Sequence, residues 1–344
     1  MSYKEKYLKL KKKYIQIKYM QLIGSSIQFE NNGYELSLLT PEQKENSKFL
    51  LDALKQYDFA LKHASDKLKE DYNFILTAIE INARALEFAS DKLKYDRSFI
   101  LKAIKINGLA LKYASDNFKK DKEIVLAAVT KNGLALEFAH ISLKQEQDRN
   151  IVFVAISQNG LALEFASDDF KKDKEIVLAA VIQNGFALKF ADISLKKDKT
   201  FILNAVRIDG TALKYATQEL QKLEDYKEVV LAAITKHAFA LQYAEDLQDN
   251  YEFILAAVTQ NGLALQYASQ ELQDNKAVVL AAVTQNGLAL KYAQYKKKRD
   301  REIVLATVNQ NSDLLEYVSG FVDSTIILEA QNMIKLKKNK NLII

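Results

Sequence analysis

The strongest constraint on how this chain folds is a unit of about 25 residues that recurs along most of its length. One copy, over residues 121–139, reads DKEIVLAAVTKNGLALEFA. Each copy opens with an Asp or Asn, whose side chain can accept hydrogen bonds from the free amides of a first helical turn. We therefore expect a helix to begin after each opening, and the regular period predicts a solenoid. The openings are Asn46, Asp71, Asp96, Asp121, Asp148, Asp173, Asp198, Asp225, Asn250, Asn275, Asp300 and Asp323.

The first half of each copy predicts a long helix, which in the copy above runs from Lys122 to Asn132. At 100° per residue its apolar side chains fill an arc of about 200°. So wide an arc suits a helix packed between its own partner helix and the neighbouring repeat. Ala128 recurs in most copies, and a small side chain there lets two helices approach closely.

An Asn-Gly pair ends this helix, and its glycines make up seven of the ten in the chain. Glycine past a helix end adopts the left-handed conformation without steric penalty, so we expect positive φ angles here. Four copies carry Asp58, Ala83, Ala238 or Ser312 instead, and a different or strained turn is expected in them. The turn glycines are Gly108, Gly133, Gly160, Gly185, Gly210, Gly262 and Gly287.

The second half of each copy predicts another helix, which starts at Leu134 and points Glu137 away from its apolar face. Leu143 continues that face, so this helix either runs on through Ser142 or breaks and restarts there.

The predicted fold is an all-α solenoid of about eleven 25-residue helix-turn-helix repeats with a terminal capping helix near residues 323–330. We expect the repeat domain to span 40–330, opening with Thr40 as the cap of a helix that has Pro41 at its first position. A basic amphipathic helix is predicted over 1–23, a linker over 24–39 and a basic tail over 331–344.

Charge is unevenly distributed in this chain, whose net charge is +5. Residues 1–20 carry seven lysines and one glutamate, and residues 331–344 carry four lysines and no acid, so the remaining body sums to −5. A mildly acidic body argues against a general polyanion groove, which needs a basic stripe. The local cluster around Lys296 and Arg299 is interpreted as a solvated loop, with a binding site as the alternative.

The basic N-terminal segment is compatible with a short coiled coil, an anchor on an anionic membrane, a localisation signal, or a solvated helix on the end of the repeats. No apolar run is long enough for a membrane helix, and the lysine-rich start lacks the core of a signal peptide. The absence of cysteine excludes disulfides, thiolate metal sites and cysteine nucleophiles, and fits a reducing compartment. These features predict a cytoplasmic protein that is not secreted.

The residue before the aromatic in the second half of each copy points outward and varies in charge. Variation within a fixed frame is what a recognition surface shows, and also what an unconstrained solvated surface shows. The candidate binding residues on this stripe are Glu87, Lys112, Glu137, Glu164, Lys189, Lys214, Gln242, Gln266 and Lys291. A second polar stripe on the first helix, which includes Thr130, Thr259 and Gln260, suits a protein groove better than a phosphate track.

The aromatic residue itself recurs from Phe88 to Tyr317, and single-stranded nucleic acid could stack on such rings. However, an α-helical wheel places the position inside the apolar arc, which favours a buried stack between repeats. The recurring asparagines, such as Asn132, are expected to cap turns, with peptide clamping as the alternative. His63, His140 and His237 have no partners at ligand spacing, so we predict no metal site, and no cofactor motif is present.

The pattern V-L-A-A-V-x-x-N-G-x-A-L-x-x-A occurs at residues 125–139, 177–191 and 279–293. It resembles a tandem-repeat family catalogued as a domain of unknown function, found largely in giant DNA viruses of amoebae and in some amoeba-associated bacteria. The opening YKEKYLKLKKKY also resembles the start of many Mimivirus-type proteins. The resemblance to the repeat family covers about residues 46–330. It implies an all-helical repeat fold and a viral or host-interaction setting, in the host cytoplasm or the virion, and brings no catalytic residues.

The sequence therefore predicts a non-catalytic scaffold that binds a protein or peptide partner. The alternative is a nucleic-acid binder that uses the basic ends and the variable outer stripe.

Overall fold

The computed structural model describes residues 36, 39–145, 148–216 and 226–341. The predicted basic helix over 1–23 lies outside these residues, and so does the linker over 24–39 apart from residues 36 and 39. Within the described residues all regular structure is helical and no strand occurs, which confirms the all-α solenoid. The chain divides into two compact units, Met1–Ser167 and Asp168–Ile344, and each is described by itself.

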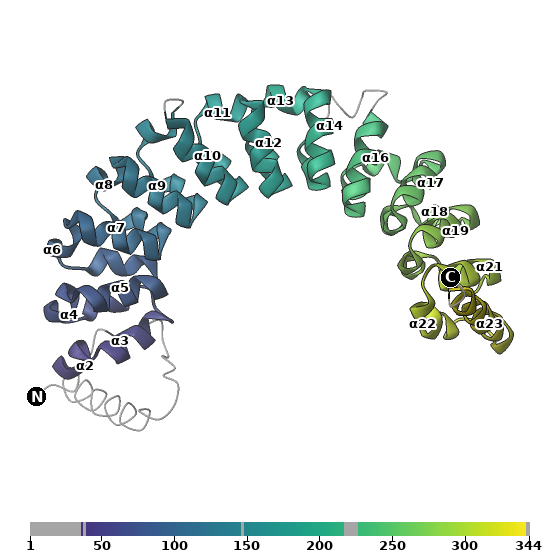
Figure 1. Cartoon of the computed structure of the whole chain (residues 1–344), viewed down its shortest axis with the longest axis horizontal. Coiled ribbons are helices and arrows are strands. Elements are labelled where there is room, and N and C mark those ends of the chain that lie inside the picture. The colour runs from purple at the N-terminus through teal and green to yellow at the C-terminus, as the bar shows by residue number, and fades with distance from the viewer. Residues whose placement is uncertain (1–35, 37–38, 146–147, 217–225, 342–344) are drawn as a thin grey trace, which may run out of the picture. The chain divides into compact units, whose positions relative to one another are not determined.

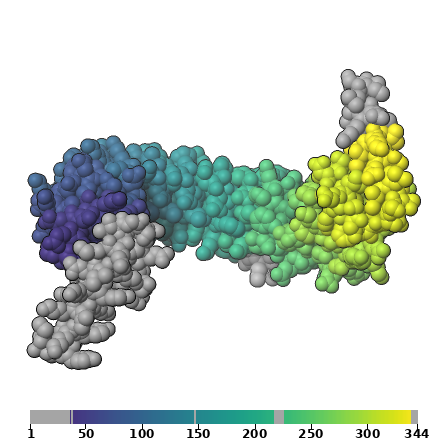
Figure 2. All heavy atoms as spheres, turned by 90° about the horizontal axis from the view of Figure 1, so that it is seen from below, coloured from purple at the N-terminus to yellow at the C-terminus, as the bar shows by residue number. Residues whose placement is uncertain are grey.

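Each repeat begins with a long α-helix, called helix A below. Successive helices A pack side by side within each unit (Figure 1), and in Figure 2 the described side chains of neighbouring repeats in a unit meet without a gap. The first unit holds α3 (Ser47–Leu54), α5 (Tyr72–Ile81), α7 (Arg97–Ile106), α9 (Lys122–Lys131) and α10 (Arg149–Gln158). The second holds α12 (Lys174–Gln183), α14 (Lys199–Ile208), α16 (Tyr226–Lys236), α17 (Tyr251–Gln260), α19 (Lys276–Gln285) and α21 (Arg301–Gln310).

The expected caps begin most of these helices. Asp121 accepts hydrogen bonds from the amides of Glu123 and Ile124, at 3.0 and 3.2 Å. Thr40 and Gln43 form a reciprocal capping box around α2 (Pro41–Glu45), with Pro41 in the first turn. Asp148 differs, because its carboxylate makes no cap and instead lies 2.5 Å from Lys122 Nζ in the preceding repeat.

The second half of each repeat is not one α-helix. In most repeats whose second half the structure describes, it is a 3₁₀ helix followed, after a break, by a short third helix. The 3₁₀ helices are η2 (Ala60–His63), η3 (Ala83–Phe88), η4 (Gly108–Tyr113), η5 (Gly133–Phe138), η8 (Gly160–Phe165), η9 (Gly185–Phe190), η10 (Gly210–Tyr215), η11 (Ala238–Tyr243), η13 (Gly262–Tyr267), η14 (Gly287–Tyr292) and η15 (Ser312–Leu314). The third helices are α4 (Asp66–Glu70), α6 (Asp91–Lys94), α8 (Asp116–Lys120), η6 (Ile141–Lys144), α11 (Asp168–Lys172), α13 (Ile193–Lys197), η12 (Glu245–Leu247), α18 (Gln270–Gln273) and α20 (Tyr295–Lys298); α22 (Leu315–Ser319) follows η15 directly.

A hydrogen bond between repeats explains the break. Ala139 is extended (φ −65°, ψ 147°), so the chain leaves the 3₁₀ helix there. The next amide, that of His140, then donates to the carbonyl of Lys119 in the preceding repeat, at 2.9 Å. The same bond joins Ser90 to Lys69 and Asp192 to Lys171. In an unbroken helix these amides would donate to carbonyls of the same helix. The break therefore allows the hydrogen bonds that join stacked repeats.

The turn glycines were expected in the left-handed conformation, and this prediction is wrong. None of the six described in detail has a positive φ angle. The glycine instead lies where another backbone passes close by: a Cβ atom on Gly108 would sit 2.5 Å from the carbonyl oxygen of Ala128 in the next repeat. The recurring alanine, Ala128 in this copy, therefore packs against the 3₁₀ helix of the preceding repeat rather than against a second long helix.

Because the turn needs no positive φ, the copies with Ala83 and Ala238 keep the same backbone, whereas the copy with Asp58 has the different turn that was expected, with η2 beginning only at Ala60. Asn82 before Ala83 has φ −149° and ψ 121°, and Asn132 before Gly133 has φ −151° and ψ 111°. His237 before Ala238 is also similar, at φ −140° and ψ 108°. The different turn expected at Ala83 and Ala238 does not occur.

The core repeats with the sequence. In α9 the fully buried side chains are Ile124, Val125, Ala128 and Val129, and Leu136 of η5 is equally buried. Equivalent positions are buried in nearly every copy, so each repeat covers the apolar surface of its neighbours.

The terminal helix α23 (Ser324–Asn341) is longer than expected. It does not end near Ala330, so the predicted basic tail over 331–344 is helical as far as residue 341. Contacts with α21 lie on both sides of the expected end at Ala330. Before it, Arg301 pairs with Glu329, and after it, Lys337 Nζ donates to the carbonyl of Asn309 at 2.7 Å. α23 packs against α21 as the next helix A would.

Candidate interaction surfaces

The sequence-predicted stripe lies on the 3₁₀ helices, one residue per repeat, and every member is exposed. Its members are Glu87, Lys112, Glu137, Glu164, Lys189, Lys214, Gln242, Gln266 and Lys291. Successive members belong to successive repeats, so within each unit they form one row. In the first unit Lys112 is the one lysine beside three acids, Glu87, Glu137 and Glu164, so this row offers no continuous track for phosphates.

The aromatic ladder is only half-buried, which corrects the predicted buried stack. Tyr113, Phe138 and Phe165 all keep part of their rings exposed. The prediction assumed 100° per residue, whereas a 3₁₀ helix advances about 120°. Phe138 therefore lies one turn beyond the buried Ala135, at the outer end of the packed segment.

Lysines of the stripe lie over these rings. Lys112 Nζ is 5.7 Å from the ring centre of Tyr113 and 5.6 Å from that of Phe138 in the next repeat. In the second unit Lys214 Nζ lies within 5.8 Å of the ring centres of Tyr215, Phe186 and Tyr243. Such cation–π contacts cover ring faces that a nucleic-acid base would need for stacking.

A second lysine, seven residues after the stripe, closes the 3₁₀ helix. Lys144 Nζ donates to the carbonyl of Glu137 at 2.8 Å, and Lys196 Nζ donates to that of Lys189 at 2.6 Å. Burial lowers the pKa of both ammonium groups below the ordinary lysine value. These lysines are therefore part of the fold rather than free surface charges.

The asparagines cap the turns, as predicted. Asn132 Oδ1 accepts from the amide of Leu134 at 3.0 Å. Some also reach the preceding repeat, since Asn107 Nδ2 donates to the carbonyl of Ile79 at 3.1 Å.

Three glutamines near the end of helix A, which hold the position that Gln260 has on the second polar stripe, bond the glycine turn instead. Gln285 Oε1 accepts from the amide of Gly262 at 2.6 Å, and Gln310 Oε1 accepts from that of Gly287 at 2.8 Å. Gln158 does the same for Gly133 at 2.5 Å. Sequence reasoning missed this role, although the recurrence of Gln directly before Asn was a usable signal.

Charges at the start of helix A are paired between repeats. Arg97 binds Asp121 at 2.8 Å and Glu123 at 2.6 Å, and Lys174 binds Asp198 at 2.6 Å. Lys276 likewise pairs with the acids at the start of α21. The hydrogen bond from Arg97 lowers the pKa of Asp121, and that from Lys174 lowers the pKa of Asp198. Repeated pairing leaves this edge close to neutral.

A third surface is the side of helix A that faces away from the rest of its repeat. In the second unit each helix A leaves one leucine half-buried there, and we call this row the helix A outer face. Its leucines are Leu178, Leu203, Leu231, Leu255, Leu280 and Leu305. The α-helical wheel placed this leucine inside the buried arc, because it took the arc to be covered on both sides.

Threonines beside these leucines have their hydroxyls turned inward. Thr259 Oγ1 donates to the carbonyl of Leu255 at 2.7 Å, and Thr284 Oγ1 donates to that of Leu280 at 2.7 Å. A hydroxyl bonded to its own helix is less available to a ligand, so the outer face is more apolar than its composition suggests.

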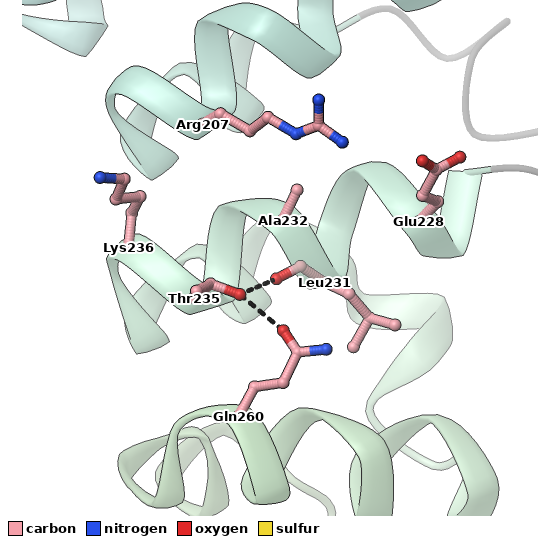
Figure 3. Close-up of a pocket in the computed structure, with 7 residues that line it drawn as sticks. All are labelled: Arg207, Glu228, Leu231, Ala232, Thr235, Lys236 and Gln260. Carbon is pink, nitrogen blue, oxygen red and sulfur yellow. Dashed lines mark hydrogen bonds between the residues drawn. The ribbon is translucent and has the colours of Figure 1, made fainter.

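The helix A outer face contains a cavity of about 390 Å³ between α14, α16 and α17. It is lined by Arg207, Glu228, Leu231, Ala232, Thr235, Lys236 and Gln260 (Figure 3). A smaller cavity of about 270 Å³ lies between α21 and α23, where Lys337 is already bonded to the carbonyl of Asn309.

No helix among the described residues combines the length and the apolar character that crossing a bilayer requires. The same residues contain no group of three or more His, Asp or Glu side chains placed to hold a metal ion.

Within each unit the stacked repeats and their shared hydrogen bonds define a tandem helical repeat protein. The chain belongs to the family described as Domain of unknown function (DUF4116), which matches residues 46–94, 96–144, 148–192, 173–221, 226–273, 250–297 and 275–320. Each matched segment spans about two of the repeats and begins at or next to a predicted helix cap. A search of curated proteins and a search of solved structures found no match.

Proposed function

We propose that this protein is a non-catalytic scaffold that binds another protein through the helix A outer face of its second unit. The observation that supports this best is the row of half-buried leucines from Leu178 to Leu305, one on each helix A. Apolar side chains that recur along one face and stay partly exposed mark a candidate interaction site.

The groups around the row favour a protein partner over a polyanion. The hydroxyls of Thr259 and Thr284 are bonded to their own helices. Glu228 and Glu302, at the start of their helices, are paired with Lys199 and Lys276 of the preceding repeats. An apolar centre with a nearly neutral edge suits an amphipathic helix or an extended peptide.

The non-catalytic part of the proposal rests on the repeat itself. Nearly every recurring residue, including Asp121, Asn132 and Gly133, has a capping, turning or packing role. The chain has no cysteine, and its three histidines fall in separate repeats.

A second candidate function is single-stranded nucleic-acid binding on the aromatic ladder. The half-buried state of Tyr113 and Phe138 favours it, since a fully buried ring could not stack on a base. Against it stand the lysines over the rings and the acids Glu137 and Glu164 within the same row.

The setting follows the sequence predictions. We propose that the protein works in the cytoplasm, and that it serves a viral or host-interacting role. An absence of cysteine and the stated resemblance support these two points.

Affinity capture at increasing salt tests the protein-scaffold proposal. The full chain is immobilised and incubated with extract of cells that produce it, with and without nuclease treatment, and then washed from about 0.1 to 0.5 M salt. We expect a captured protein to remain bound, because apolar contacts are weakly screened. Capture that depends on intact nucleic acid and falls steeply with salt would favour the second candidate instead.

A further inference from the structure

The cavity between α14, α16 and α17 has an apolar floor and a rim rich in hydrogen-bond donors. Leu231 and Ala232 form the floor, and Arg207 projects over it from α14 (Figure 3). Thr235 Oγ1 lies 2.9 Å from the carbonyl oxygen of Leu231 and 2.5 Å from Gln260 Oε1. The amide nitrogen of Gln260 points away from Thr235, so it remains a donor at the rim (Figure 3).

Arg207 is the unusual residue in this cavity. The equivalent positions of α17 and α19 carry Thr259 and Thr284. Its guanidinium is exposed, and among the described residues it has no ion-pair or hydrogen-bond partner. The nearby Glu228 is held by Lys199 at 3.4 Å instead. Arg207 therefore adds an unpaired cation to a surface whose other charges are mostly paired.

Lys236 adds a second cation to the residues that line the cavity. It is exposed and has no partner among the residues that the structure describes. Arg207, Lys236 and the Gln260 amide supply donors only, apart from the Gln260 oxygen that faces Thr235. The one carboxylate at the rim, Glu228, pairs with Lys199 of the preceding repeat. The cavity therefore offers positive charge beside an apolar floor.

We infer that this cavity binds a partner peptide in which an aliphatic side chain neighbours an aspartate or glutamate. The aliphatic side chain packs on Leu231 and Ala232, and the carboxylate pairs with Arg207, whose planar fork matches it in two hydrogen bonds. A volume of about 390 Å³ is at the small end of ligand clefts, which fits one or two side chains. The inference rests on the proposed function, because it assigns the partner's chemistry at the same face.

A nucleic acid fits this cavity less well. Two unpaired cations cannot follow a phosphate backbone, and Glu228 and Glu252 lie at the starts of the two adjoining helices. No aromatic ring lines the cavity to stack a base. An aliphatic group with one carboxylate satisfies both the floor and the rim.

Selection from a displayed random 12-residue peptide library against the intact chain tests this inference. Selected peptides are then synthesised with a fluorescent label, and their affinities are measured for three proteins: wild type, Arg207→Thr and Lys105→Thr. Threonine at position 207 copies α17 and α19, so the variant should unfold at the wild-type temperature. Lys105 holds the same helix position in α7 of the first unit, so its replacement removes one charge away from the cavity.

We expect selected peptides to share an aliphatic residue next to an acid. Their affinity should fall roughly 10- to 100-fold in Arg207→Thr, as for loss of a charged hydrogen-bonded pair, and stay unchanged in Lys105→Thr. Selected peptides without acids, affinities equal in both variants, or no enrichment at all would overturn the inference. Preferential binding of a labelled oligothymidine by the wild type over Arg207→Thr would also overturn it. Each of these results concerns the cavity alone. The proposed function would still stand if a protein partner bound elsewhere on the helix A outer face.

Discussion

Gly108 shows that glycine recurs in this protein because space is short, not because the backbone is left-handed. Its φ angle is not positive, yet a Cβ atom there would meet the carbonyl oxygen of Ala128 at 2.5 Å. The same approach recurs at Gly210 and Gly262, against Ala233 and Ala282. The alanine and the glycine are therefore one contact, made between a long helix and the 3₁₀ helix of the repeat before it.

Replacing Gly108 with alanine should destabilise the protein by about 1–3 kcal/mol, because backbone must move to admit the methyl group. Gly320→Ala is the matched control. Its added Cβ would lie 3.7 Å from the nearest atom, and its φ of −72° suits alanine. Thermal unfolding of both variants checks this; equal midpoints would show that the approach at Gly108 is not tight.

Gln285 should matter more than its exposed position suggests. It accepts from the amide of Gly262 at 2.6 Å and donates to the carbonyl of Gln260 at 3.2 Å, so it links two repeats. Gln285→Ala should lower the free energy of unfolding by about 1–2 kcal/mol, since it leaves a part-buried amide without its acceptor. Gln266→Ala on the exposed stripe is the control, and a similar loss there would contradict this role.

At the scale of elements, each repeat is a long helix, a 3₁₀ helix and a short helix, joined to the neighbours along three edges. Paired charges connect the starts of the long helices, as at Arg97 and Asp121. Glutamine–glycine bonds connect their ends, and backbone bonds such as His140 to Lys119 connect the short helices. A repeat thus satisfies several of its polar groups only when stacked.

The paired charges predict how stability varies at acid pH. Arg97 and Lys174 hold the pKa values of Asp121 and Asp198 below that of a free aspartate in the folded chain. The stabilisation is therefore complete above about pH 4, the unfolded value, and is lost as pH falls through the lowered folded values. Urea midpoints between pH 7 and pH 2.5 measure it. In Arg97→Gln the midpoint should fall less over this range, and an identical fall would contradict the assignment.

Much of this organisation could be predicted from the sequence. The period, the caps such as Asp121, the positions of the turns and the exposed stripe at Glu137 follow from local rules that hold in isolation, although the left-handed conformation expected at the turn glycines does not occur. The 3₁₀ helix did not follow, because its break depends on a bond from His140 to another repeat. The half-buried rings were missed for the same reason, since Phe138 was placed on an α-helical wheel. The uncovered leucines, such as Leu255, required knowing which side of helix A has no neighbour.

At the scale of the molecule, most recurring residues cap, turn or pack the repeats, and the recurring leucine of the helix A outer face is left partly exposed. What varies is the outward side of helix A, where Arg207, Thr259 and Asn309 hold equivalent positions in different repeats. Within the second unit these residues border one row of leucines. A surface with a constant apolar centre and a variable border suits recognition of a particular protein segment.

Paired charge variants on two surfaces test the central claim most directly. Thr259→Glu with Thr284→Glu places two acids beside Leu255 and Leu280, while Gln242→Glu with Gln266→Glu places two on the 3₁₀ stripe. All four positions are exposed, so both variants should fold as the wild type does. Partner binding in solution should weaken at least about tenfold in the threonine variant and stay near the wild-type value in the glutamine variant. Loss of binding in the glutamine variant alone would contradict the claim and assign the interaction to the stripe.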